Sequence, residues 1–236
     1  MSSIRHNFVL MFSLGVSIFG LLIVLLLAFN PPVASENFFW RRPLVGSVFS
    51  LICVLGIFAA LFPKQCSQVF HFRRASVSFA SHQIYSTSHH PTCEKFSAHV
   101  IHVSGHTHCA ACTGLLFGAL TALIGTVFYF SGGWHIEEVS FPLIFIGTVG
   151  AILGFLQFKF QSLIRLVSNT FFVVGAFLIL VGIDELTESL FVDLFLVALA
   201  VFWILTRIQL SQWDHWRICS GCKSPCEVRE IEKKEV

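Results

Sequence analysis

Six long apolar segments constrain this chain more than any other feature of its sequence. They cover residues 8–29, 44–62, 110–130, 141–158, 166–183 and 190–206, and only the last contains a charged residue, Asp193. About 20 apolar residues, each rising about 1.5 Å, cross a hydrocarbon core of about 30 Å. Because lipid offers the backbone no hydrogen bonds, each segment is expected to be a helix. The predicted fold is all-α, a polytopic membrane bundle of six transmembrane helices.

The composition agrees with a membrane protein. Hydrophobic residues make up 55% of the chain and charged residues 12%, against about 25% charged in a typical soluble domain. This composition excludes a soluble enzyme, a disordered tail and a coiled coil. The first apolar segment has 22 residues, more than the roughly 7–15 of a secretory signal peptide, so we expect a retained helix. Cleavage after it would leave five helices in the same orientation.

The basic residues predict the orientation. With the N-terminus inside, 13 of the 15 Lys and Arg residues lie on the inner side, and only Arg41 and Arg42 lie outside. Basic residues collect on the cytoplasmic side of membrane proteins. We therefore expect a multi-pass protein of the cell membrane with both termini in the cytoplasm. The net charge of +2 is explained by this bias and does not suggest nucleic-acid binding.

This orientation divides the chain into four parts. Residues 1–62 form a first transmembrane hairpin, and residues 110–206 form a four-helix transmembrane region. Between them lies a cytoplasmic loop, residues 63–109, which contains eight of the 11 histidines. The cytoplasmic tail comprises residues 207–236. No span contains a histidine and Asp193 is the only acid within one, which argues against transport of a metal ion through the bundle.

Small and polar residues predict how the helices pack. Small residues recur at helical spacing on two spans, at Gly114, Gly118, Ala122, Gly150 and Gly154. Such faces let two helices approach closely in lipid. Ser168, Asn169 and Thr170 are expected to form hydrogen bonds between helices. Asp193 lies about one helical turn from the outer boundary, where we expect water to reach it, and an acid within a span is a candidate functional residue.

Seven of the eight cysteines lie on the predicted cytoplasmic face, and only Cys53 is deep within a span. Cytoplasmic thiols stay reduced, so the pattern favours metal binding or catalysis over disulfides. Cys109-Ala-Ala-Cys112 opens the third span, and residues 99–108 before it are predicted to form a hairpin turning at 104–105. A hairpin that leads into Cys-x-x-Cys resembles half of a zinc-ribbon module. Cys219-x-x-Cys222, followed by Cys226, could supply the other half.

Two assignments of the ligands are open. In the first, Cys109, Cys112, Cys219 and Cys222 share one zinc ion and join the loop to the tail. In the second, Cys93 and a histidine complete the site of Cys109 and Cys112. Cys219, Cys222 and Cys226 then bind metal separately, with a fourth ligand from another part of the chain. The segment 89–93, His-His-Pro-Thr-Cys, favours the second. Cysteines without metal are the remaining alternative.

Residues 89–118 resemble a group of uncharacterised prokaryotic, largely archaeal, membrane proteins. That group carries His-His-Pro-x-Cys, followed by Cys-x-x-Cys-x-Gly at the start of a transmembrane helix. In this chain the matching residues are 89–93 and 109–114, within about 30 residues. The resemblance implies that His90, Cys93, Cys109 and Cys112 act together. It implies no reaction.

The leading hypothesis is non-enzymatic. It describes a bundle whose cytoplasmic zinc module braces the helices or docks a protein partner. The first alternative is a membrane thiol–disulfide oxidoreductase, because a helix N-terminus stabilises a thiolate at Cys109-x-x-Cys112. Cys219-x-x-Cys222 would be its relay pair, although the cytoplasmic side counts against disulfide formation. The second alternative is an iron–sulfur electron-transfer subunit that uses Cys93 with the tail cysteines. No motif of a hydrolase or a nucleotide-binding protein occurs.

Overall fold

The computed structural model describes residues 2–32, 39–62, 94–103, 106–133 and 137–220. Within these residues, six helices are long and apolar enough to cross a membrane. They are α1 Ser2–Phe29, α2 Arg41–Leu61, α4 Ala110–Gly132, α5 Ser140–Phe155, α6 Ser162–Thr187 and α7 Leu190–Ser220. The span of α5 continues beyond the α-helix to Lys159. The prediction of six helices long and apolar enough to cross a membrane is confirmed.

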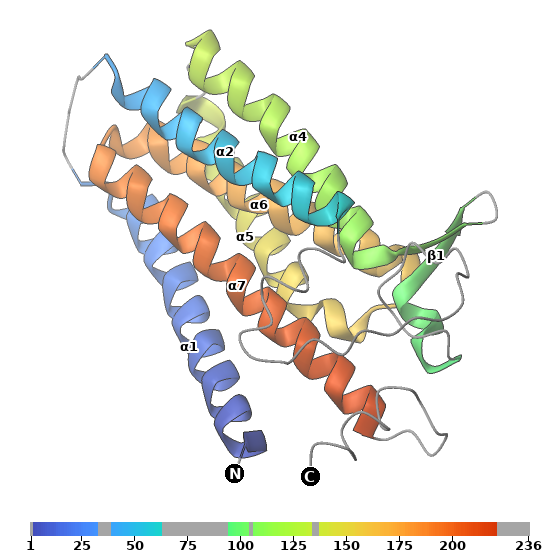
Figure 1. Cartoon of the computed structure of the whole chain (residues 1–236). Coiled ribbons are helices and arrows are strands. Elements are labelled where there is room, and N and C mark those ends of the chain that lie inside the picture. Colours follow the sequence, from blue (N-terminus) through green and yellow to red (C-terminus); the bar gives the residue numbers. More distant parts are fainter. Residues whose placement is uncertain (1, 33–38, 63–93, 104–105, 134–136, 221–236) are drawn as a thin grey trace.

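The six helices run side by side and alternate in direction (Figure 1). α1 begins and α7 finishes at one end of the bundle, where the short strands also lie. We call this the hairpin end. The opposite end, where α2, α5 and α7 begin, is called the loop end. α6 is the central helix, since it packs against α4, α5, α7 and α1.

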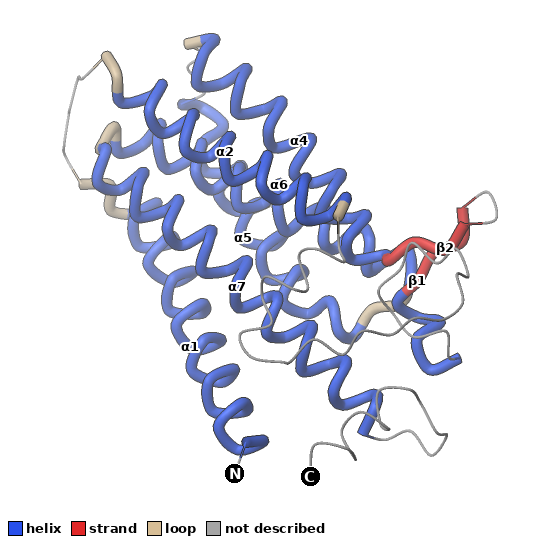
Figure 2. The backbone as a smooth tube through the Cα atoms, in the orientation of Figure 1, coloured by secondary structure: helices blue, strands red, loops and turns tan. Residues whose placement is uncertain are grey.

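A small hairpin precedes α4. The strands β1 Val100–Val103 and β2 His106–Cys109 pair antiparallel (Figure 2), in a register that sets Val100 opposite Cys109 and Val103 opposite His106. The hairpin predicted over residues 99–108 is therefore confirmed. Short 3₁₀ turns flank the larger elements: η1 Glu94–His99 before β1, η2 Glu137–Val139 before α5, and η3 Leu156–Lys159 after it. β2 runs directly into α4, so Cys109 lies at the junction of strand and helix.

The last helix is longer than its apolar segment. α7 continues to Ser220, whereas the sequence analysis placed residues 207–236 in the tail. The predicted span ends at residue 206 because the apolar segment ends there and the charged residues Arg207 and Asp214 follow. Both side chains are nevertheless buried, at 4% and 2% exposed, because they pair with groups on other elements. The helix therefore does not need to end where the apolar segment ends.

The glycines are used for close helix packing, as predicted. A Cβ added at Gly118 of α4 would lie 2.9 Å from the carbonyl oxygen of Thr170 on α6. A Cβ at Gly150 of α5 would lie 2.5 Å from the carbonyl oxygen of Phe171. Contacts this short leave no space for a side chain, so these glycines let α4 and α5 approach the backbone of α6.

The predicted hydrogen bonds between helices are also present for two of the three residues. Thr170 Oγ1 on α6 donates to the carbonyl oxygen of Gly114 on α4, at 3.0 Å. Asn169 Oδ1 accepts a hydrogen bond from Arg207 Nε on α7, at 2.6 Å. Ser168 is buried at 3% exposed. These polar groups connect α6 to helices on two of its sides, at the hairpin end.

Candidate functional site

Cys109 and Cys112 lie at the start of α4. Cys109 is the residue before the first turn, with an extended backbone (φ −71°, ψ 118°), and Cys112 is in that turn. Cys109 is 7% exposed and Cys112 is half-buried. The first N–H groups of a helix have no partner within it and carry a partial positive charge. Both thiols therefore lie where the backbone favours negative charge.

A buried arginine adds to this positive field. Arg207 of α7 donates from Nε to Asn169 Oδ1 at 2.6 Å and from Nη2 to Gln157 Oε1 at 3.2 Å. Both acceptors are neutral amides. Its guanidinium, which stays charged in proteins, lies near enough to Cys112 and Cys109 to attract a thiolate at either position. An anionic sulfur would be the natural counter-charge of this cation.

The polar groups around this cation have an excess of hydrogen-bond donors. The side-chain nitrogen Nε2 of Gln157 is buried and has no hydrogen-bond partner among the described residues. Leaving a buried donor unsatisfied costs about 1–3 kcal/mol. We call Cys109, Cys112, Gln157, Asn169 and Arg207 the thiol site. Its excess of positive charge and of donors suits an anionic group.

A second set of buried charges attaches the hairpin to the bundle. Arg165 of α6 donates from Nη1 to His99 Nδ1 at 2.5 Å and from Nη2 to Asp214 Oδ2 at 3.0 Å. Arg165 Nη1 also lies 3.3 Å from His99 Nε2, so the guanidinium faces the nitrogen-bearing edge of the imidazole ring. His99 Nε2 lies 3.7 Å from Asp214 Oδ2. These contacts fix the residue before β1 and hence the hairpin that carries Cys109.

The loop end contains a larger buried group of charges. It consists of Arg41 and Arg42 of α2, Tyr129 of α4, Asp184 and Glu185 of α6, and Asp193 of α7, and we call it the loop-end cluster. Arg41 Nη1 lies 2.5 Å from Asp184 Oδ1 and 2.5 Å from Asp193 Oδ2. Asp184 and Asp193 are both 0% exposed. The expectation that water reaches Asp193 is therefore wrong, because the side chain packs among α2, α6 and α7.

Glu185 and Tyr129 extend the loop-end cluster. Glu185 Oε2 accepts from Arg42 Nη2 at 2.8 Å. The hydroxyl oxygen of Tyr129 lies 2.7 Å from Asp184 Oδ2 and 2.7 Å from Glu185 Oε2. Arg42 also lies over the ring of Tyr129, with its guanidinium carbon 5.2 Å from the ring centre.

Neither set of ion pairs was predicted from the sequence, although the charge pattern contains a signal for one of them. Arg41 and Arg42 are the two basic residues that the orientation places outside. Asp184, Glu185 and Asp193 are acids near the same boundary. Opposite charges at one membrane boundary could have suggested pairing. Nothing comparable indicates the hairpin-end pairs, because His99 is one of many loop histidines.

The predicted metal ligands are only partly within the described residues. The structure brings Cys109 and Cys112 together in one helical turn. Cys219 is in the last turn of α7, and the other four predicted ligands, His90, Cys93, Cys222 and Cys226, lie outside the described residues. Among the described residues, no group of three or more His, Cys, Asp or Glu side chains is arranged to hold a metal ion.

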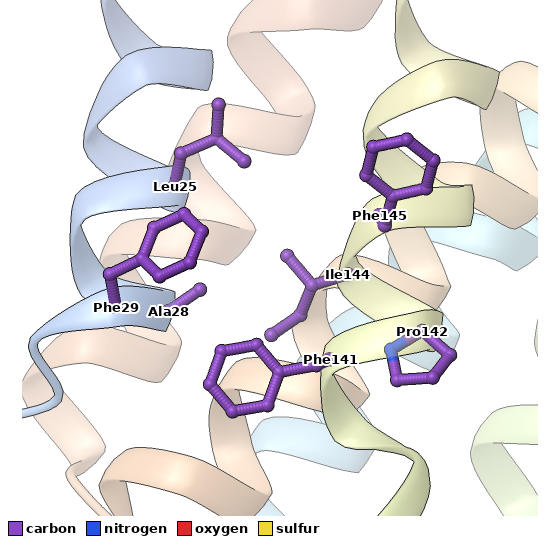
Figure 3. A pocket seen from close by; sticks show the side chains of 7 residues that line it. All are labelled: Leu25, Ala28, Phe29, Phe141, Pro142, Ile144 and Phe145. Carbon is purple, nitrogen blue, oxygen red and sulfur yellow. The ribbon is translucent and has the colours of Figure 1, made fainter.

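The bundle also has an apolar pocket of about 320 Å³ at the loop end (Figure 3). α1 and α5 line it with Leu25, Ala28, Phe29, Phe141, Pro142, Ile144 and Phe145. Apolar side chains line it throughout, so it offers no group for acid–base or metal chemistry. It lies away from the thiol site, which is at the hairpin end.

Comparisons with protein families, with curated proteins and with solved structures return no match to this chain.

Proposed function

We propose that this chain is a multi-pass membrane protein whose hairpin end carries a zinc-binding module with a structural or docking role. The observation that carries the proposal is the environment of Cys109 and Cys112. Both lie at the N-terminus of α4, beside a buried Arg207 whose hydrogen-bond acceptors are neutral. Zinc is bound by thiolates, and this environment favours a thiolate over a thiol.

The proposed ligand set is His90, Cys93, Cys109 and Cys112. The first two are separated by two residues, as are the last two, and the hairpin lies between the pairs. Three thiolates and a neutral histidine around Zn²⁺ leave one unit of negative charge. The guanidinium of Arg207 would balance that charge. The resemblance to prokaryotic membrane proteins with the same two motifs favours the same set.

In this ligand set the tail cysteines, Cys219, Cys222 and Cys226, would bind metal separately.

The module would then serve the bundle or a partner rather than catalyse a reaction. His99, Arg165 and Asp214 attach the hairpin to α6 and α7, and zinc would fix the chain that precedes it. With the predicted orientation, the module faces the cytoplasm. A protein partner on that side could dock on it.

The test is the metal content of the full-length protein purified in detergent without chelators. Elemental analysis should find zinc, and Cys109→Ser or Cys112→Ser should each remove about one zinc per chain. Cys53→Ser is the matched control because Cys53 is buried within α2, and it should leave the zinc content unchanged. Protein without zinc, or zinc unaffected by both variants, would contradict the proposal. Iron with visible absorption would instead indicate an iron–sulfur site.

The same thiol environment favours one second candidate, a membrane thiol–disulfide oxidoreductase. In that reaction, Cys109 and Cys112 would form a disulfide and give two electrons and two protons to an acceptor such as a quinone. The positive field at α4 and Arg207 would stabilise the attacking thiolate. Metal-free protein in which a quinone oxidises these two thiols, and a dithiol reduces them again, would select this candidate.

A further inference from the structure

Two aromatic rings join the end of the α5 span to α7 at the hairpin end. Phe158 of η3 and Trp213 of α7 pack edge to face, with ring centres 6.1 Å apart and ring planes at 88°. η3 lies beside α7 at this end of the bundle (Figure 1). Trp216, three residues further along α7, is 48% exposed. Two elements thus share one aromatic surface.

A cation lies over each ring of this pair. Lys159 Nζ is 6.0 Å from the ring centre of Phe158. The guanidinium carbon of Arg217 is 5.1 Å from the ring centre of Trp213. The face of an aromatic ring attracts a cation at such distances. The order of groups along the surface is therefore cation, ring, ring and cation.

Both cations are at the membrane boundary. The span that contains α5 ends at Lys159, and the span of α7 ends at Ile218. Lys159 is exposed, and the side chain of Arg217 is 52% exposed. Long basic side chains at the end of a span place their charge at the level of the lipid headgroups. Tryptophan favours the same level, because its ring is apolar and carries one N–H group.

The chain around this surface is rich in positive charge. Residues 156–165 and 207–220 contain four basic residues and one acid, Asp214. Asp214 is 2% exposed, so its carboxylate does not repel an anion that approaches from the membrane surface. Its Oδ1 accepts from Arg217 Nη2 at 3.0 Å. A guanidinium has five N–H donors, so Arg217 can bind a phosphate group while it holds Asp214.

We propose that this surface binds the headgroup of an anionic phospholipid in the leaflet at the hairpin end. We call it the lipid site, and it consists of Phe158, Lys159, Trp213, Trp216 and Arg217. The two cations bind the charged headgroup, and the rings contact the glycerol and the first methylene groups of the acyl chains. With the predicted orientation, this leaflet is the cytoplasmic one, whose anionic lipids attract basic residues beside a span.

A phospholipid accounts for more of these features than the packing of η3 does. The contact between Phe158 and Trp213 is enough to hold η3 against α7, and it needs neither of the two cations. A lipid uses the cations and the rings together, because its charged headgroup is bonded to apolar chains. The exposed ring of Trp216 then contacts lipid as well.

The test is quenching of tryptophan fluorescence by brominated lipid in the full-length protein reconstituted in bilayers. All the proteins compared carry Trp40→Phe and Trp134→Phe. Trp203 is 2% exposed within the bundle, so the quenching reports on Trp213 and Trp216. Brominated phosphatidylglycerol, mixed in varied proportion with phosphatidylcholine, gives the binding constant of the anionic lipid relative to the zwitterionic one.

Removing both cations should abolish the preference for the anionic lipid. We expect a relative binding constant of at least about five with both cations present, because each basic residue near an anionic membrane contributes about fivefold. In Lys159→Gln/Arg217→Gln the constant should fall to about one. The matched control, Lys159→Arg/Arg217→Lys, keeps both charges and should keep the preference. Circular dichroism should show the same helix content in all three proteins.

Three results would overturn the proposal. The first is equal binding of the two lipids when both cations are present. The second is a preference that survives in Lys159→Gln/Arg217→Gln, since the anionic lipid would then bind elsewhere. The third is loss of the preference in the charge-preserving control, since charge would then not be what binds the headgroup. The lipid site contains no cysteine or histidine, so these results are independent of the zinc module.

Discussion

At the scale of single residues, buried arginines differ in whether a carboxylate faces them. Arg165 has Asp214, and Arg41 has Asp184 and Asp193. Arg207 instead donates to two amide oxygens and lies near two thiols. A buried cation that has no carboxylate beside it stabilises the anionic form of any nearby group that can ionise. This difference makes Arg207 the cation that would favour an anionic sulfur at Cys109 and Cys112.

Replacing Arg207 should slow the reaction of the thiols. In chelator-treated protein, we expect Arg207→Gln to lower the rate at which iodoacetamide alkylates Cys112 by about threefold to tenfold, because a thiolate is the reactive form. Arg207→Lys keeps the charge and should retain most of the rate. Alkylation followed by mass spectrometry gives both rates.

Arg217→Gln serves as the control for Arg207→Gln. Arg217 is on the same helix, but 52% of its side chain is exposed, so its loss should have little effect on the rate. Equal rates for wild type and Arg207→Gln would show that the guanidinium does not favour the thiolate.

Removing Asp214 should destabilise the protein. Asp214→Ala leaves Arg165 buried without its carboxylate, and breaking a buried pair in this way costs about 3–5 kcal/mol. Unfolding in detergent, followed by intrinsic fluorescence, measures the loss. Glu138→Ala, which removes an exposed acid, should change stability by no more than about 0.5 kcal/mol. A similar small change for Asp214→Ala would mean that water or lipid solvates Arg165.

At the scale of elements, the bundle depends on close contacts between α6 and its neighbours. Gly150 approaches the backbone of α6 near Phe171, and Gly118 approaches it near Thr170. An apolar side chain gains little free energy when it moves from lipid into a contact between helices. Helix association in a membrane therefore relies on close packing and on hydrogen bonds. The sequence predicted these faces because small residues recur at intervals of four.

Adding one methyl group at Gly150 should therefore weaken the bundle. Gly150→Ala forces a Cβ against the carbonyl oxygen of Phe171, and overpacking of this kind costs about 1–3 kcal/mol. Gly15→Ala is the matched control, because a Cβ at that position of α1 has nothing within 4 Å. Thermal unfolding of the two variants in the same detergent tests the difference. If Gly150→Ala is as stable as Gly15→Ala, α5 and α6 can separate at no cost.

At the scale of the whole molecule, buried charge is distributed unevenly between the two ends. At the hairpin end, Arg165 and Arg207 are buried with one acid, Asp214. At the loop end, the buried Arg41 and the partly buried Arg42 face three carboxyl groups. The hairpin end is therefore the more positive end among the described residues. The orientation itself stays a prediction from the Lys and Arg residues of the connecting segments.

The orientation can be tested in intact cells. An epitope appended after Val236 should react with antibody only after the cells are permeabilised, because the tail is predicted to be cytoplasmic. The same epitope inserted at residues 134–136, on the opposite side, should react without permeabilisation. Reaction of the tail epitope in intact cells would reverse the predicted topology and place the thiol site outside.

The sequence alone determined the number and approximate place of the helices, the hairpin before α4 and the glycine faces. These features depend on local composition and on periodicity, which neighbouring residues in the chain carry. The sequence also predicts that Cys109 and Cys112 lie close together, because they are one helical turn apart. The extension of α7 from residue 207 to Ser220 was not predicted, because its polar residues are buried only through contacts with other elements.

Only the tertiary structure decided the partners of the buried charges. Arg41 meets Asp184 and Asp193 from 143 and 152 residues away, and Arg207 meets Asn169 from 38 residues away. Whether an arginine has a carboxylate, an amide or a thiol beside it depends on which helices become neighbours. Local patterns do not contain that information, because charged residues near a span boundary look alike until the bundle buries them together.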